Sequence, residues 1–271
     1  MSKTYLLIGG SYGIGKDIID QLPEGSEIIV ASRTNEGLAG KQVTHIPFDV
    51  LEDTLSLDQL PSKIDGFAYC PGSINLRPFR GLKPEAFTND FEINVMGAVR
   101  CLQSIEPLLA ASEQASVVLF STVAVQTGMP FHASVAASKG ALEGLARSLA
   151  EEWAPKVRVN VIAPSITDTP LANRFLNNEA KKEKASLRHP LKRIGTTEDV
   201  AQLAAFLLTD KSSWMTGQIL GLDGGMSSLN ISGLYYFGFV AICAFTIMRV
   251  STTHLAMQTK CYPHLYLTSP S

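Results

Sequence analysis

The chain has 271 residues, of which 45% are hydrophobic and 18% are charged, and its formal net charge at pH 7 is −2. This length and composition predict a globular protein with one large domain and a tail, or with two small domains. The charge argues against nucleic acid as the main partner, because nucleic-acid binding usually needs a basic surface. The four cysteines are too widely spaced for a zinc motif or a disulfide framework, so we expect a reducing compartment and no metal site.

The chain starts with a strand-like run at residues 4–8 and lacks the basic and apolar regions of a signal peptide, which favours a cytoplasmic protein. Apolar runs then alternate with helical stretches, a pattern typical of a parallel sheet covered on both faces. It predicts one doubly wound α/β domain over residues 1–228, a three-layer sandwich with a seven-stranded, mostly parallel sheet. The further strands are expected at 27–31, 43–48, 66–69, 117–120, 157–162 and 218–222, and helices at 84–106, 134–153 and 198–208.

Three glycines, Gly9, Gly13 and Gly15, lie between the first strand and the first helix. Glycine lets the backbone turn tightly there and lets a pyrophosphate approach without a Cβ in the way. The amides at the start of the helix then face the anion. The segment therefore predicts a dinucleotide site, and the alternative is a glycine-rich turn without a ligand.

The second strand ends in Ser32 and Arg33. Sites specific for NAD usually carry a carboxylate here, which binds the 2′-hydroxyl of the adenosine ribose. A guanidinium instead favours a 2′-phosphate through charge-assisted hydrogen bonds. We therefore expect NADP(H) in preference to NAD(H), unless Arg33 is only a solvated surface residue.

Together these and later motifs resemble the short-chain dehydrogenase/reductase family over about residues 3–228. The cradle at 8–15, IGGSYGIG, is similar to the family's TGxxxGIG, with isoleucine where threonine is usual. Residues 69–72, YCPG, take the place of the family's NNAG and keep only its glycine. Matching segments also occur at Asp49-Val50, Ile93-Asn94-Val95, Ser138-Lys139, 160–164 (NVIAP), Thr169-Pro170, 190–200 and 222–225 (LDGG).

The resemblance implies a Rossmann-type fold and hydride transfer between NADP(H) and a small carbonyl, alcohol or enoyl substrate. It also implies a homodimer or tetramer built through the two long helices at 84–106 and 134–153. The cofactor-binding residues that it implies are Gly9, Ser11, Tyr12, Gly13, Ile14, Gly15, Ser32, Arg33, Asp49, Val50, Pro71, Gly72, Lys139, Pro164, Ile166 and Thr169.

The proton donor of the family is a tyrosine four residues before the active-site lysine, on the same face of a helix. Here the lysine is Lys139 and the residue four positions earlier is Val135, which can neither donate nor accept a proton. The remaining catalytic candidates are Thr122, in the place of the serine that orients the substrate carbonyl, and Asn94, in the place of the family's helix asparagine.

Three interpretations of the missing tyrosine stay open. In the first, His132 donates the proton; it lies seven residues before Lys139, almost two helical turns, and the related enoyl-thioester reductases have their tyrosine at this spacing. In the second, hydride transfer is completed by Thr122, Lys139 or water. In the third, the protein binds NADP(H) without catalysis, as a sensor or scaffold.

Two segments outside these motifs remain ambiguous. The region 171–192 is rich in lysine and arginine, which could attract an acidic or phosphorylated substrate or could be a solvated helix face. In the tail 229–271, residues 231–248 are free of charge and are followed by Arg249. This apolar segment is short for a membrane anchor, and burial between subunits or a sequence unrelated to the fold are the alternatives.

Overall fold

The computed structural model describes residues 2–229, and the domain forms one compact unit, Met1–Ser228. The apolar segment 231–248 lies outside the described residues, so the three interpretations of it stay predictions. Within residues 2–229, no helix is long and apolar enough to cross a bilayer.

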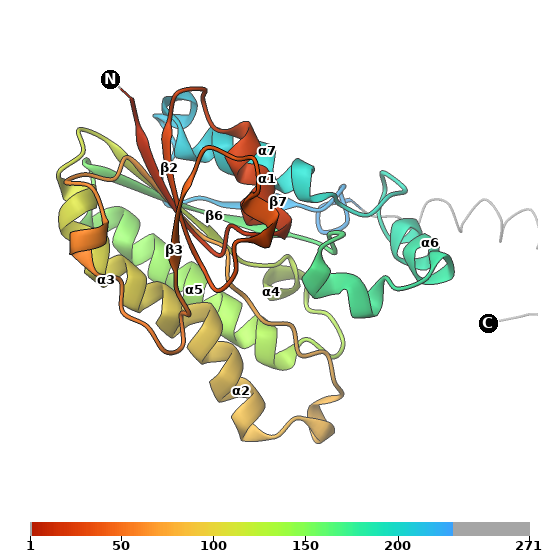
Figure 1. Cartoon of the computed structure of the whole chain (residues 1–271). Helices are drawn as coiled ribbons and strands as arrows, with labels where there is room; N and C mark the ends of the chain where they lie inside the picture. The colour runs from red at the N-terminus through yellow and green to blue at the C-terminus, as the bar shows by residue number, and fades with distance from the viewer. Residues whose placement is uncertain (1, 230–271) are drawn as a thin grey trace, which may run out of the picture. The chain divides into compact units, whose positions relative to one another are not determined.

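A single sheet of seven parallel strands forms the centre of the domain (Figure 1). The strands are β1 (Thr4–Ile8), β2 (Glu27–Ser32), β3 (Thr44–Pro47), β4 (Gly66–Tyr69), β5 (Ala115–Phe120), β6 (Val157–Pro164) and β7 (Ile219–Leu222). Their order is β3-β2-β1-β4-β5-β6-β7, so Leu6 of β1 pairs with Ile29 on one side and with Phe67 on the other. The chain thus builds the sheet outward in both directions from β1, and the crevice between β1 and β4 is the topological switch point.

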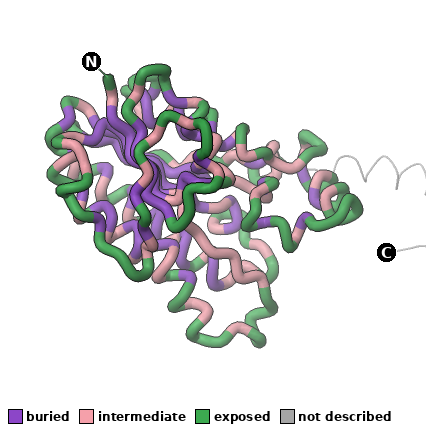
Figure 2. The backbone as a smooth tube through the Cα atoms, in the orientation of Figure 1, coloured by how far each residue is buried: buried purple, intermediate pink, exposed green. Residues whose placement is uncertain are grey.

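Helices cover both faces of this sheet. They are α1 (Gly13–Gln21), α2 (Pro84–Phe91), α3 (Gly97–Ala110), α4 (Ala124–Thr127), α5 (Ala133–Glu152), α6 (Glu179–Leu187) and α7 (Thr197–Leu208). One core contains residues of α3 and α5, and the other contains residues of α1 and α7. The five inner strands, β1, β2, β4, β5 and β6, are buried nearly throughout, as Figure 2 shows in purple, while the edge strands β3 and β7 are partly exposed. The predicted doubly wound, three-layer α/β fold is confirmed.

The helix expected at 84–106 differs in one respect. It is divided into α2 and α3 by a π-helical turn, Glu92–Met96, in which Asn94 lies at the middle and is fully buried. Such wide turns are rare and occur mostly at functional sites. Hydrophobic periodicity cannot reveal one, because the same apolar face continues on both sides of it.

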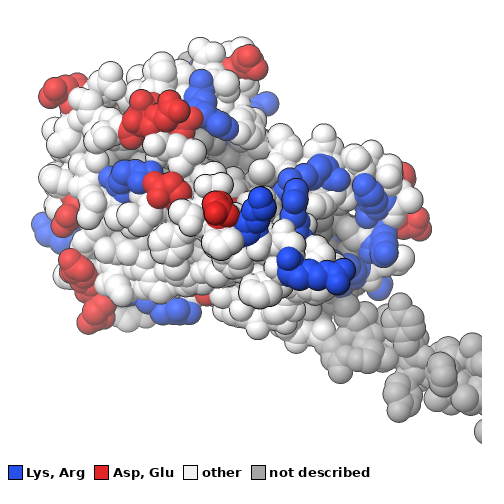
Figure 3. Space-filling model, turned by 90° about the horizontal axis from the view of Figure 1, so that it is seen from below, with Lys and Arg blue, Asp and Glu red and all other residues white. Residues whose placement is uncertain are grey.

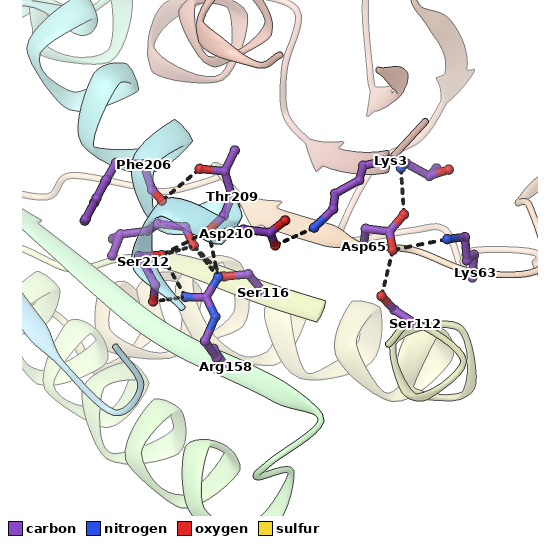
Figure 4. Close-up of polar contacts among 12 residues, drawn as sticks. Lys3, Lys63, Asp65, Ser112, Ser116, Arg158, Phe206, Thr209, Asp210 and Ser212 are labelled. Carbon is purple, nitrogen blue, oxygen red and sulfur yellow. Dashed lines mark hydrogen bonds and ion pairs between the residues drawn. The ribbon is translucent and has the colours of Figure 1, made fainter. Parts of the chain in front are cut away.

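Buried polar contacts lie along the side of the sheet at which the strands begin, its amino-end edge (Figure 4). The guanidinium of Arg158, at the start of β6, donates to the carbonyls of Leu207 and Thr209, which end α7, at 3.1 and 3.0 Å. Asp65, before β4, accepts hydrogen bonds from the backbone of Thr4 and from the hydroxyl of Ser112. These contacts join β6 to α7 and β4 to β1 and Ser112, so this edge of the sheet has a structural role, and the candidate site lies at the carboxyl-end edge.

Replacing Arg158 with Met is expected to lower the free energy of unfolding by about 3 kcal/mol, because the terminal carbonyls of α7 lose a buried charged donor. Urea unfolding of the purified protein measures this. Arg188→Met is the control, since Arg188 is exposed. If both variants unfold at the same urea concentration as the parent, the assigned role of Arg158 is wrong.

Candidate functional site

A cleft of about 300 Å³ lies at the carboxyl ends of β1, β2 and β4, at the switch point of the sheet. The residues around it come from the ends of those strands and the loops that follow them, from the segment after β3, from the 3₁₀ helix after Thr169, and from the π turn. The predicted cofactor residues that line it are Gly9, Ser11, Tyr12, Gly13, Ile14, Gly15, Ser32, Arg33, Asp49, Val50, Pro71, Gly72 and Thr169. The structure therefore brings most of the predicted set together around one space.

The glycine cradle forms one wall of this cleft. Gly9 has a φ of 77°, and a Cβ there would lie 3.2 Å from the ring of Pro71. A Cβ on Gly15 would lie 2.6 Å from the carbonyl oxygen of Gly9, so the loop and α1 can approach this closely only with glycine. The N-cap of α1 is Tyr12, whose side chain makes no capping hydrogen bond. The first amides of α1 are therefore free to bind an anion.

The far end of the cleft holds its charged residues, Arg33 and Asp49. The side chain of Arg33 is 67% exposed, and its guanidinium lies 4.0 Å from the carboxylate of Asp49. This ion pair is loose and leaves the guanidinium able to bind an anion. The hydroxyls of Ser11 and Thr34 lie 3.2 Å apart and link the cradle to the end of β2. Sequence reasoning missed Thr34, although its position directly after Arg33 was a usable signal.

Three predicted cofactor residues lie away from the lining of this cleft: Lys139, Pro164 and Ile166. Pro164 is the last residue of β6, and its carbonyl accepts a hydrogen bond from Val123. Ile166 packs against the small apolar cluster around Leu176. The cleft also includes residues outside the predicted cofactor-binding set: Ile8, Ala31, Thr34, Phe48, Leu51, Cys70, Ile93, Pro170 and Leu171.

Lys139 lies on α5, only 7% exposed, and its ammonium donates to the carbonyl of Phe120 at 2.7 Å. Burial lowers its pKa from about 10.5 to about 8, against the opposing effect of Asp90. A Cβ on Gly72 would lie 3.6 Å from the lysine Nζ and 3.3 Å from the side-chain oxygen of Asn94. Because Gly72 also lines the cleft, it is the point where the cleft meets Lys139 and Asn94.

Both polar atoms of the Asn94 side chain are hydrogen-bonded. Its Nδ2 donates to Ser138 at 3.0 Å and to Ser73 at 3.2 Å, and its Oδ1 accepts from the backbone of Ser73. Thr122 follows β5, and its hydroxyl accepts only a long bond, 3.3 Å, from Ala124. The preceding residue, Ser121, is instead buried and donates to Glu143 at 2.6 Å. Of these two hydroxyls, that of Thr122 is the one free to meet a substrate.

Val135 is 4% exposed on α5, and the helix begins two residues earlier. His132 is its N-cap, and the carbonyl of His132 accepts the first helical hydrogen bond at 2.8 Å. The imidazole Nδ1 lies 2.8 Å from the carbonyl of Pro130, so Nδ1 carries a hydrogen and Nε2 is the nitrogen left to exchange a proton. The preceding residue, Phe131, has a φ of 71°, a strained conformation that tends to occur at functional sites.

The basic region around α6 forms a separate surface. Figure 3 shows Lys and Arg side chains gathered over the lobe that carries α6. Some of these cations already have partners, since Lys182 pairs with Asp168 at 2.8 Å and Lys181 donates to Asn177 at 2.8 Å. Attraction of an acidic substrate by this region stays a prediction.

Known proteins resemble this chain over most of its length. A family model described as enoyl-(acyl carrier protein) reductase matches residues 54–227. A tropinone reductase homologue of Arabidopsis thaliana is 34% identical over 254 residues, which cover 87% of this chain and 94% of that protein. A 3-oxoacyl-(acyl-carrier-protein) reductase of Thermotoga maritima is 30% identical over 241 residues, 83% of this chain and 97% of the relative.

Solved structures agree with this. The aldohexose dehydrogenase of Thermoplasma acidophilum superposes with a TM-score of 0.77 at 25% identity, over 85% of this chain and 96% of the other. The match to the family model, residues 54–227, includes β4, the π turn, the lysine helix α5 and β7. The chain therefore belongs to the short-chain dehydrogenase/reductase family of oxidoreductases.

Proposed function

We propose that this protein is an NADP(H)-linked oxidoreductase that acts on a small carbonyl, alcohol or enoyl substrate. The observation that carries the proposal is the junction at Gly72, where the cradle-lined cleft meets a buried lysine and the fixed side chain of Asn94. A dinucleotide lying in this cleft would have its pyrophosphate at the cradle and one end beside Lys139. Family membership makes hydride transfer the corresponding chemistry.

The residues present fit such a cofactor. The first amides of α1 would hold the pyrophosphate, and glycine at positions 9 and 15 permits the close packing of the loop against Pro71 and α1 that forms this wall of the cleft. Thr169, the N-cap of the 3₁₀ helix Pro170–Phe175, would contact the carboxamide end of the cofactor. The bound cofactor supplies or accepts the hydride, while Lys139 holds a ribose hydroxyl and Thr122 orients the substrate oxygen.

The choice of NADP(H) rests on Arg33. Its guanidinium has a single loose carboxylate neighbour and is largely exposed beside the cleft. A 2′-phosphate would give this group a compact dianionic partner, whereas a ribose hydroxyl would not. The second strand also ends without a carboxylate at the position that NAD-specific sites use.

Arg33→Ala is therefore expected to weaken NADPH binding about 10- to 100-fold, the loss of one or two charge-assisted hydrogen bonds, and to leave NADH binding unchanged. Quenching of intrinsic fluorescence by each cofactor measures both affinities. Arg188→Ala, which removes an exposed arginine outside the cleft, is the matched control. Equal affinities of the parent for NADPH and NADH would contradict the preference.

For the proton, we propose His132 ahead of the other interpretations of the missing tyrosine. His132 is the N-cap of α5 and lies seven positions before Lys139, a spacing of almost two turns that supports placing both side chains on one side of the helix. The bond to Pro130 fixes the ring through Nδ1. The imidazolium can then give its Nε2 proton to the substrate oxygen and keep its Nδ1 hydrogen.

The test is turnover of NADPH with a panel of carbonyl and enoyl-thioester substrates, comparing the parent with His132→Ala and Val135→Tyr. We expect the parent to turn over and His132→Ala to lose about 100-fold or more in kcat, with its NADPH affinity kept. A parent and His132→Ala that are both inactive, beside an active Val135→Tyr, would instead support a protein that binds NADP(H) without catalysis.

A further inference from the structure

A seam of buried polar groups lies between α2 with its π turn and the lysine helix α5. Asn94 and Ser138 bond across it at 3.0 Å. Asp90 lies one turn before Asn94, and Ser134 lies one turn before Ser138. Since β4, β5 and β6 are parallel, the helices that connect them run in the same direction. Asp90 and Ser134 are therefore on neighbouring turns of the same packed interface.

The carboxylate of Asp90 is fully buried. Its Oδ1 accepts hydrogen bonds from the hydroxyl of Ser73 at 2.5 Å and from the amide of Asn75 at 2.7 Å. Its Oδ2 is buried without a hydrogen-bond partner among the described residues, as is the hydroxyl of Ser134. Burying a carboxylate costs free energy unless a positive charge lies near it. We therefore expect a cation close to Asp90 at this interface.

The buried cation beside this network is Lys139. Ser73, which donates to Asp90, also accepts from Asn94, and a Cβ on the preceding residue, Gly72, would lie 3.3 Å from the Asn94 side-chain oxygen and 3.6 Å from the lysine Nζ. Asp90 and Lys139 are not in direct contact, and the carboxylate raises the pKa of Lys139 through space, against the effect of burial.

The other groups around this lysine do not offer a matching charge. Burial raises the pKa of the Cys70 thiol to about 12, so that thiol is neutral at pH 7. Glu143, one turn further along α5, accepts from Ser121 and lies 4.0 Å from Arg147.

Two further titratable groups come from the neighbouring segments. Glu92 of the π turn bonds Arg100 at 2.6 Å. His132, at the start of α5, is held by Pro130. Among the described acidic groups around Lys139, Asp90 is thus the one that has no ion-pair partner.

We propose that Asp90 is the buried counter-ion of Lys139, a positioning residue that keeps this lysine in its ammonium form beneath the cofactor cleft. The ammonium, unlike the neutral amine, stabilises negative charge that develops on a substrate oxygen. This role rests on the proposed function, but the electrostatic effect of Asp90 on Lys139 does not. Ser73 and Asn75 support this role, because their hydrogen bonds to the Oδ1 of Asp90 stabilise the charge of its carboxylate.

The direct test is the titration of Lys139 in the full chain, labelled with ¹³Cε-lysine and followed by NMR, with the signal assigned from its absence in Lys139→Met. Removing the negative charge in Asp90→Asn is expected to lower the titration midpoint by about one pH unit or more. Asp90→Glu, which keeps the charge, should hold the midpoint close to that of the parent. Asp65→Asn removes another buried carboxylate, at the amino-end edge of the sheet, and should leave it unchanged.

An unchanged midpoint in Asp90→Asn overturns the proposal. If that variant does not fold, the parent alone decides: the carboxyl ¹³C signal of Asp90 must show a step at the pH where Lys139 titrates, and the lack of such a step is equally decisive against the pair. Neither measurement needs cofactor or turnover, so a parent that fails to bind NADPH would refute the proposed function and leave the counter-ion test intact.

Where turnover is measurable, the alkaline limb of the plot of kcat/KM against pH should move to lower pH in Asp90→Asn. The shift should equal that of the Lys139 titration midpoint, and Asp90→Glu should restore the limb to its position in the parent. A merely structural role for Asp90 would lower the rate without moving that limb.

Discussion

The site depends on the burial of one ammonium group. Lys139 loses most of its hydration at the junction of α5 and the end of β5, and among the described residues it donates one hydrogen bond, to the carbonyl of Phe120. Such a group remains useful only if the protein supplies polar partners around it. The π turn places Asn94 there, Gly72 leaves room beside Nζ, and the carboxylate of Asp90 acts on it from α2. The cleft above would supply the remaining partner, a ribose.

The amino-end edge and the carboxyl-end edge of the sheet have different roles. At the amino-end edge, Arg158 and Asp65 have hydrogen-bond partners within the protein, and that network stabilises the ends of α7 and β1. At the carboxyl-end edge, the first amides of α1, the guanidinium of Arg33 and the hydroxyl of Thr122 are left with weak partners or without a side-chain cap. Unsatisfied polar groups that converge on a cleft are what a ligand site requires.

Much of the fold was predictable because its signals are local. Seven apolar runs fixed the strands, since strands buried on both faces must be apolar throughout, and the position of Gly9 and Gly15 after the first run identified the cradle. The π turn was not predictable, because the one-position shift that an extra residue makes in the apolar pattern is no larger than the irregularity of an ordinary helix. The charge relation of Asp90 to Lys139 was equally hidden, since it joins residues 49 positions apart. In the sequence alone Asp90 is one more acidic residue on a helix, and its burial appears only when α2 packs on α5.

The central claim is that a dinucleotide bound by the cradle ends beside Lys139, and a crystal structure of the full chain grown with NADP⁺ tests it most directly. The account predicts a 2′-phosphate within hydrogen-bond distance of Arg33, a pyrophosphate over the first amides of α1, and a ribose hydroxyl within hydrogen-bond distance of the Lys139 Nζ. A cofactor bound in the cleft with its nicotinamide ribose directed away from Gly72 and Lys139 would contradict it.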